Sequence, residues 1–251
     1  MYAAHVVAKK VSEMGEEKTL KGAGRVFLAA ILGGVFIGLG YYIHLESIHL
    51  FPHSPIGQVL GALLFPTGIM LVLFTGAELF TGNCLMTLGY LDNRYKMTAV
   101  LKNWIIVYVG NFIGAILLAF LIKQTGFITE SRLETLMALV EPKLSRTFIE
   151  AFTLGFLCNV LVAIAVYSTF ASYSEIGQFV TLWFPITLFV LAGFEHSIAN
   201  MFILPLGLFS GMEITWETIF IKNILPVTFG NITSGALFIP ILYYMIYIHD
   251  K

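Results

Sequence analysis

The chain has 251 residues, of which 58% are hydrophobic and 12% are charged, and its formal net charge is −1. Its mean hydropathy of +0.86 lies outside the range of soluble globular proteins, and its apolar stretches are long enough to cross a bilayer as helices. A near-neutral charge excludes the basic surface that a nucleic-acid-binding protein needs. Composition therefore predicts an all-α integral membrane protein.

Cysteine and histidine usage gives no support for a cofactor. Cys84 and Cys158 both lie within apolar stretches, which predicts buried free thiols rather than a disulfide or a thiolate metal site. The chain has neither the intramembrane histidine pairs of a haem protein nor the cysteine cluster of an iron–sulfur protein. It also lacks the phosphate-binding loop of an ATP-driven pump. We expect no cofactor, no metal and no enzymatic activity.

The first quarter of the chain predicts a polar segment, a span and a loop. Residues 1–21 are polar and of mixed charge, unlike a cleavable signal, and we assign residues 1–25 to a cytoplasmic N-terminal segment. Residues 26–43 form an apolar run of spanning length. Residues 44–55, HLESIHLFPHSP, carry three histidines at irregular spacing, which favours an exposed loop over a metal site.

Residues 56–91 are too long to be one straight span. A continuous helix of that length would measure roughly 54 Å, against a hydrocarbon core of about 30 Å. The polar group GAELFTGN, residues 76–83, is the natural place for an interruption. Non-helical backbone at membrane depth must be buried in protein or line a cavity, so we expect a broken second helix beside a pathway.

The second half of the chain repeats this pattern. Residues 92–103 are polar, residues 104–122 form the third span, and residues 123–146 form an amphiphilic connection with a predicted break at Pro142. Residues 148–167 form the fourth span. Residues 179–209 would measure roughly 46 Å as one helix, so the fifth helix should break within GFEHSIAN, residues 193–200. A short amphipathic piece at 215–222 precedes the sixth span at 224–248.

The two interruptions belong to an internal duplication. They share the pattern G-x-E-x-x-x-x-N, and a Lys-Asn pair and a Gly-Asn pair also recur in both halves: Gly76 with Gly193, Glu78 with Glu195, Asn83 with Asn200, Lys102-Asn103 with Lys222-Asn223, and Gly110-Asn111 with Gly230-Asn231. The repeats cover about residues 25–122 and 146–248 of one transmembrane domain, residues 26–248. Three spans per repeat predict an inverted 3+3 arrangement. Lysine and arginine are more frequent in the segments on the side of the termini, which predicts that both termini are cytoplasmic.

Four motifs carry a family resemblance. GAELFTGN, FLCNVLVAIAVY, GFEHSIANMF and LPVTFGNITSGA, in this order, resemble the formate/nitrite transporter family over residues 25–247. The resemblance implies an aquaporin-like protomer in a homopentamer, embedded in the inner (cytoplasmic) membrane and passing small monovalent anions: formate, nitrite or hydrosulfide. Ile69 stands where formate-type members tend to have leucine, which leaves the choice of anion open.

The resemblance also implies the pore residues. The central and polar positions are Thr81, Lys143, Asn159, Glu195, His196, Asn200 and Asn231, and the apolar constrictions are Phe65, Ile69, Phe80 and Phe189. From spacing alone, ordinary packing remains open for the apolar set. Asn159 and Asn231 could line the path or knit helices together. Lys143 could attract anions or be a solvated loop lysine.

Histidine chemistry leaves the mechanism open. His196 could change charge near neutral pH and pass a proton, or remain a neutral hydrogen-bond donor paired with Thr81. We expect Glu78 and Glu195 to accept hydrogen bonds from backbone N–H groups freed at the breaks. The sequence thus favours a passive anion channel, with a proton-coupled secondary transporter that uses His196 as the alternative.

Overall fold

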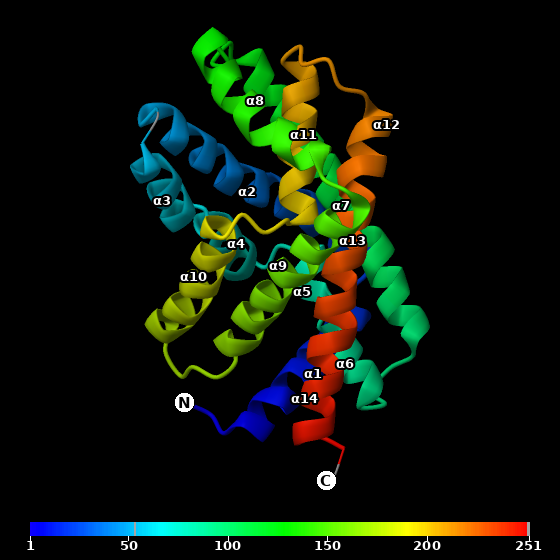
Figure 1. Cartoon of the computed structure of the whole chain (residues 1–251). Helices are drawn as coiled ribbons and strands as arrows, with labels where there is room; N and C mark the ends of the chain where they lie inside the picture. Colours follow the sequence, from blue (N-terminus) through cyan, green and yellow to red (C-terminus); the bar gives the residue numbers. More distant parts are fainter. Residues whose placement is uncertain (53, 250–251) are drawn as a thin grey trace.

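The long apolar stretches form a bundle of helices (Figure 1). The computed structural model describes residues 1–52 and 54–249. The helices of the first half are α1 (Ala4–Leu20), α2 (Ala23–Leu50), α3 (Pro55–Leu64), α4 (Thr67–Thr75), α5 (Phe80–Asn83), α6 (Met86–Leu91) and α7 (Met97–Gln124). Those of the second half are α8 (Glu130–Ser145), α9 (Phe148–Thr169), α10 (Glu175–Leu191), α11 (Ser197–Phe209), α12 (Trp216–Thr218), α13 (Leu225–Ile232) and α14 (Ile239–Tyr247), with π-helical turns η1 (Ile219–Ile224) and η2 (Thr233–Phe238).

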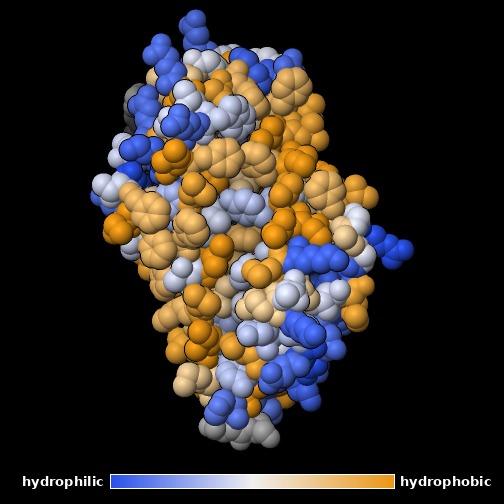
Figure 2. Space-filling model, turned by 90° about the vertical axis from the view of Figure 1, so that its right-hand side faces the viewer, coloured by the Kyte–Doolittle hydropathy of each residue, from blue (hydrophilic) through white to orange (hydrophobic). Residues whose placement is uncertain are grey.

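Six stretches of the described chain can cross a membrane. Five are long enough by themselves: Ala23–Leu50, Pro55–Thr75, Met97–Gln124, Phe148–Thr169 and Trp216–Tyr247. The sixth crossing consists of two shorter apolar helices, α10 and α11, with the second break between them. Apolar side chains cover much of the surface between hydrophilic ends (Figure 2). An all-helical membrane fold with six spans, as predicted, is confirmed.

Both predicted helix breaks are present and have the same geometry. Gly76 and Gly193 have positive φ angles of 75° and 70°. The residue after each glycine donates its N–H to a carbonyl five positions earlier, as Ala77 does to Val72 at 2.9 Å. This is the hydrogen bond of a helix C-terminus closed by glycine, which reaches a left-handed conformation without a Cβ penalty. The chain then runs extended for a few residues before α5 and α11 begin.

The structure places the two ends of the chain on one side of the bundle. Helices α1 and α14 lie together at the lower end in Figure 1, and α8 lies at the opposite end. An even number of spans requires this arrangement. That the lower end is cytoplasmic remains a prediction.

Two sequence predictions about connections were wrong. Helix α2 continues to Leu50, so His44 and His49 are helical, and His53 lies outside the described residues. Residues 44–50, HLESIHL, contain no proline or glycine, so the helix continues through them and ends just before Pro52. Pro142 lies inside α8 and does not end it, because proline removes only one backbone donor and the last turn closes after it.

The boundaries of two other elements also differ. Helix α7 begins at Met97, so the polar residues up to Asn103 are part of the third helix. The predicted separate pieces at 215–222 and 224–248 form one continuous helical stretch of alternating α and π turns. Polar residues at a helix end mark the membrane boundary there, not the end of the helix.

Candidate functional site

Two cavities open toward the middle of the bundle from opposite ends. The α1-side cavity, of about 280 Å³, is lined by residues of α1, α4 and the first break, among them Lys18, Ile69, Glu78 and Leu79. The α8-side cavity, of about 190 Å³, is lined by residues of α2, α8, α10 and the second break. The two linings share no residue in the described part of the chain, so a layer of protein separates the cavities.

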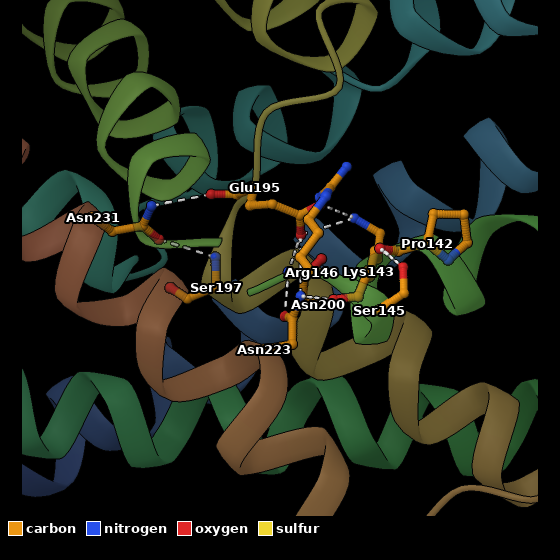
Figure 3. Close-up of polar contacts among 9 residues, drawn as sticks. All are labelled: Pro142, Lys143, Ser145, Arg146, Glu195, Ser197, Asn200, Asn223 and Asn231. Atoms are coloured by element: carbon orange, nitrogen blue, oxygen red, sulfur yellow. Dashed lines mark hydrogen bonds and ion pairs between the residues drawn. The ribbon is translucent and has the colours of Figure 1, made fainter. Parts of the chain in front are cut away.

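A charge cluster stands at the α8-side cavity (Figure 3). The Glu195 carboxylate accepts two hydrogen bonds of 3.0 Å from Lys143 Nζ and a further one from Arg146. Asn200 Nδ2 donates to the same carboxylate at 2.5 Å and to Asn223 Oδ1 at 2.7 Å. Glu195 is 1% exposed, and two cations against one carboxylate leave one positive charge in excess.

The α1-side cavity has an equivalent cluster. Glu78, also 1% exposed, pairs with Lys18 and with Lys21, whose Nζ lies 2.9 Å from Oε1. Asn83 Nδ2 donates to Glu78 at 2.9 Å and to Asn103 Oδ1 at 2.8 Å. The glutamate and the two asparagines repeat those of the other half, with Lys18 and Lys21 in place of Lys143 and Arg146, and this cluster too leaves one positive charge in excess.

The expected role of the two glutamates at the freed backbone was wrong. Their carboxylates bind lysine, arginine and asparagine side chains, and asparagines from the third and sixth spans hold the breaks instead. Asn111 Oδ1 accepts from Phe80 N–H at 2.9 Å, and its Nδ2 donates to the carbonyls of Ala30 and Glu78 at 2.7 and 2.8 Å. A neutral amide suits this position because it both donates and accepts.

Asn231 repeats this pattern at the second break. Its Oδ1 accepts from Ser197 N–H at 3.0 Å, and its Nδ2 donates to the carbonyls of Gly155 and Glu195 at 2.7 and 3.1 Å (Figure 3). Asn159 donates to the carbonyl of Asn231 at 2.7 Å and, more weakly, to that of Thr81 at 3.4 Å. The sequence left two roles open for Asn159 and Asn231. In the structure, both asparagines make hydrogen bonds that connect neighbouring helices.

Thr81 and His196 meet between the cavities. His196 Nε2 lies 2.9 Å from Thr81 Oγ1, and both side chains are buried. His196 Nδ1 accepts the Ala199 N–H at 3.2 Å, so in the neutral ring the proton is on Nε2. A second proton on Nδ1 would point at the Ala199 N–H and break this helix-capping bond. The geometry therefore fixes Nε2–H as a hydrogen-bond donor at the centre.

Apolar side chains flank this polar pair. The rings of Phe65 and Phe189 meet edge to face with centroids 5.5 Å apart, and both line the α8-side cavity. The Phe189 ring also stacks on the His196 imidazole at 5.9 Å. Ile69 is 2% exposed and lines the α1-side cavity. Of the four predicted constriction residues, Phe65 and Phe189 thus line the α8-side cavity and Ile69 lines the α1-side cavity.

Phe80 is placed differently. Its ring packs against Tyr108 and Trp104 of α7, with centroids 4.8 and 6.1 Å away. Leu79, one residue earlier, lines the α1-side cavity. Because the backbone is extended at this point, neighbouring side chains face opposite ways. The sequence motif located the segment but not which of the two residues faces the cavity.

Several residues of the site were not among the predicted ones. Lys18 and Lys21 carried no local signal, whereas Leu79 lies within GAELFTGN, Arg146 begins the second repeat, and Asn111 was visible in the repeated Gly-Asn pair. Cys84 and Cys158 are buried free thiols, as predicted. Within residues 1–52 and 54–249 no group of three His, Cys, Asp or Glu residues could hold a metal ion.

Comparison with known proteins agrees with this architecture. The family model of the formate/nitrite transporter matches residues 5–245. A probable formate transporter of Methanothermobacter thermautotrophicus is 37% identical, over 97% of this chain and 96% of its own length. The formate channel FocA of Escherichia coli strain K12 is 32% identical, over 98% of this chain and 94% of its own length.

Solved structures give the same result. A pentameric formate channel with formate bound matches with a TM-score of 0.78 and 32% identity, over 90% of this chain and 98% of that one. An FNT family ion channel, at 23% identity, has the same fold with a TM-score of 0.88, over 95% and 98% of the two chains. The chain therefore belongs to the formate/nitrite transporter family, as a multi-pass membrane transport protein and not an enzyme.

Proposed function

We propose that the chain forms a passive channel for small monovalent anions, with formate as the first substrate to test and nitrite and hydrosulfide as related ones. One observation carries the proposal. Two cavities with an excess positive charge enter the bundle from opposite ends; His196 lines the α8-side cavity and bonds Thr81, whose neighbours Leu79 and Gly82 line the α1-side cavity.

The excess charge at each cavity attracts anions and repels cations. In each cluster only one carboxylate pairs with two cations: Lys143 and Arg146 in one, Lys18 and Lys21 in the other. In a confined space with apolar walls such a charge raises the local anion concentration. The symmetric placement serves entry from either side, as a passive channel requires.

The apolar layer makes passage selective. A bare anion entering it loses hydration at a cost of several kcal/mol. The Nε2–H of His196 and the Thr81 hydroxyl supply hydrogen bonds there to replace part of the lost hydration. Small anions with one charge can use both donors, while the Phe65–Phe189 contact opposes larger ones.

The geometry at His196 favours the channel over the proton-coupled transporter. A proton-carrying histidine needs a free second nitrogen, and here Nδ1 accepts the Ala199 N–H. The relatives support the assignment by name: they include formate channels of Bacillus thuringiensis and Escherichia coli. We further propose a homopentamer with one pore per protomer, in the cytoplasmic membrane with both termini inside, in line with the pentameric structural relative.

Flux in liposomes tests the function. The purified protein would be reconstituted and assayed for uptake of formate, nitrite and hydrosulfide, with acetate and potassium as comparison ions and empty liposomes as the control. We expect anion flux that follows the concentration gradient in either direction and a reversal potential that reports one negative charge per formate.

Each other outcome has a distinct meaning. Accumulation of formate against its gradient when only a pH gradient is imposed would support the proton-coupled transporter. Flux of none of the three anions above that of empty liposomes would refute the anion-channel proposal.

A further inference from the structure

A third cavity lies next to the α1-side cavity and shares Lys18 and Lys21 with its lining. It has a volume of about 160 Å³ and is formed where the end of α1, the start of α2 and the second turn of α7 meet. Its polar wall includes Lys18, Lys21 and Lys102, and its apolar wall includes Val26 and Ile106. We name it the Lys102 pocket.

The pocket holds more positive charge than the protein neutralises. Lys18 and Lys21 share the single carboxylate of Glu78, and Lys102 has no carboxylate partner among the described residues. Burial lowers the pKa of Lys18 from its usual value, against the opposing effect of Glu78. An additional anion in the pocket would relieve this unfavourable concentration of charge.

An apolar surface adjoins the pocket. On α7 and α2, Leu101, Ile105 and Leu28 are 47%, 67% and 64% exposed in the protomer. The lysines lie at the α1 end of these helices, where the apolar surface gives way to charge. Basic pockets between helices at this depth suit the phosphate groups of anionic lipids, with the acyl chains along the apolar surface.

We propose that the Lys102 pocket binds the phosphate group of an anionic phospholipid. The phosphate would lie between Lys102 and the pair Lys18 and Lys21, and the acyl chains would follow the exposed apolar side chains of α7. Because Lys18 and Lys21 also hold Glu78, an occupied pocket would contact the cluster that supports the first break. The site shares Lys18 and Lys21 with the α1-side cavity, but phosphate binding at Lys102 does not require that the chain conduct anions.

Native mass spectrometry of the full chain tests this proposal. Protein purified in detergent would be equilibrated with equal amounts of phosphatidylglycerol and phosphatidylcholine, and retained lipids counted for the wild type, Lys102→Gln and Lys123→Gln. Lys123 is the matched control because it lies at the opposite end of α7. We expect Lys102→Gln to lower phosphatidylglycerol affinity about fivefold, the factor for about 1 kcal/mol per lysine at an anionic surface.

A second experiment distinguishes lipid phosphate from free inorganic phosphate. Added inorganic phosphate that leaves lipid retention unchanged assigns the pocket to lipid. Competition by millimolar phosphate supports the same phosphate chemistry with free phosphate as the ligand. Equal phosphatidylglycerol retention by all three proteins would overturn the proposal. The midpoint of thermal unfolding of Lys102→Gln in detergent, expected to equal that of wild type, confirms that the variant is folded.

Discussion

The two helix breaks have the same scaffold and different centres. Each has a glycine with positive φ, a buried glutamate held by two cations, and an asparagine from a neighbouring span that binds the extended backbone. They differ at the two positions that face the middle of the protein. Where the second break has His196 the first has Leu79, and where the first has Thr81 the second has Ile198.

This difference separates the residues that hold the fold from the residues that can act on the anion. Features present in both halves are what any broken helix in this fold needs to satisfy its backbone and bury its glutamate. The polar pair formed by Thr81 and His196 exists only because the halves diverged at those positions. Conduction chemistry should therefore depend on the divergent residues, and folding on the repeated ones.

The largest effect on formate flux should come from a substitution that makes the second break resemble the first. His196→Leu, which installs the residue of the other half, removes the central Nε2–H donor. We expect formate flux to fall about 10- to 100-fold, the value of one hydrogen bond to a charged group. Flux in liposomes measures the loss. His196→Asn keeps an N–H donor and is the control, so equal losses in both variants would contradict the donor role.

Removing either of the two repeated asparagines should lower the stability of the protein by a similar amount. Asn111→Leu and Asn231→Leu each remove three buried hydrogen bonds to backbone groups. We expect each to lose about 3 kcal/mol or more of stability, at about 1 kcal/mol or more per group. Thermal unfolding in detergent measures this.

Thr233→Val is the control for the asparagine variants, because its hydroxyl bonds only within its own helix. A loss confined to one asparagine variant would show that the two breaks are not held in the same way.

The charge clusters allow a finer comparison. The side chains of Lys143 and Arg146 are 11% and 24% exposed, whereas those of Lys18 and Lys21 are 16% and 46% exposed. A cation that loses its carboxylate partner destabilises the protein more when its side chain is less exposed to water. Glu195→Gln should therefore cost about 3 kcal/mol and Glu78→Gln less. Thermal unfolding of the two single variants decides this, and a larger loss for Glu78→Gln would reverse the ranking.

The smallest effect should be on selectivity. Phe189→Ala removes the ring that contacts both Phe65 and His196. We expect the permeability of acetate relative to formate to rise about tenfold, because one methyl group is discriminated by about that factor in a tight site. Phe184→Ala, at a 69% exposed position of the same helix, is the matched control. An unchanged ratio would assign Phe189 to packing alone.

The sequence predicted the breaks because their signals are local. Apolar runs longer than a bilayer and the pattern G-x-E-x-x-x-x-N locate both interruptions within a few residues. The partners of the glutamates were not predictable in the same way, since Lys18 lies 60 residues from Glu78 and Lys143 lies 52 from Glu195. Only the folded chain brings them together.

The orientation of single side chains at the breaks was also beyond the sequence. Phe80 was expected to form a constriction, but its ring packs on α7 and Leu79 lines the α1-side cavity instead, because the extended backbone before α5 sets which side chain points inward. Asn111 shows the opposite case. The Gly-Asn repeat marked it, and comparison with Asn231 would have assigned it the same role.

The protonation state of His196 tests the central claim most directly. Nitrogen-15 NMR of the histidine-labelled protein, with His196→Asn to assign the signal, reports which ring nitrogen carries a proton. We predict one neutral tautomer from pH 7.5 to 5.5, with the proton on Nε2 and Nδ1 accepting from Ala199. An imidazolium signal for His196 that appears within this range would contradict the fixed-donor account and point to a proton-carrying histidine.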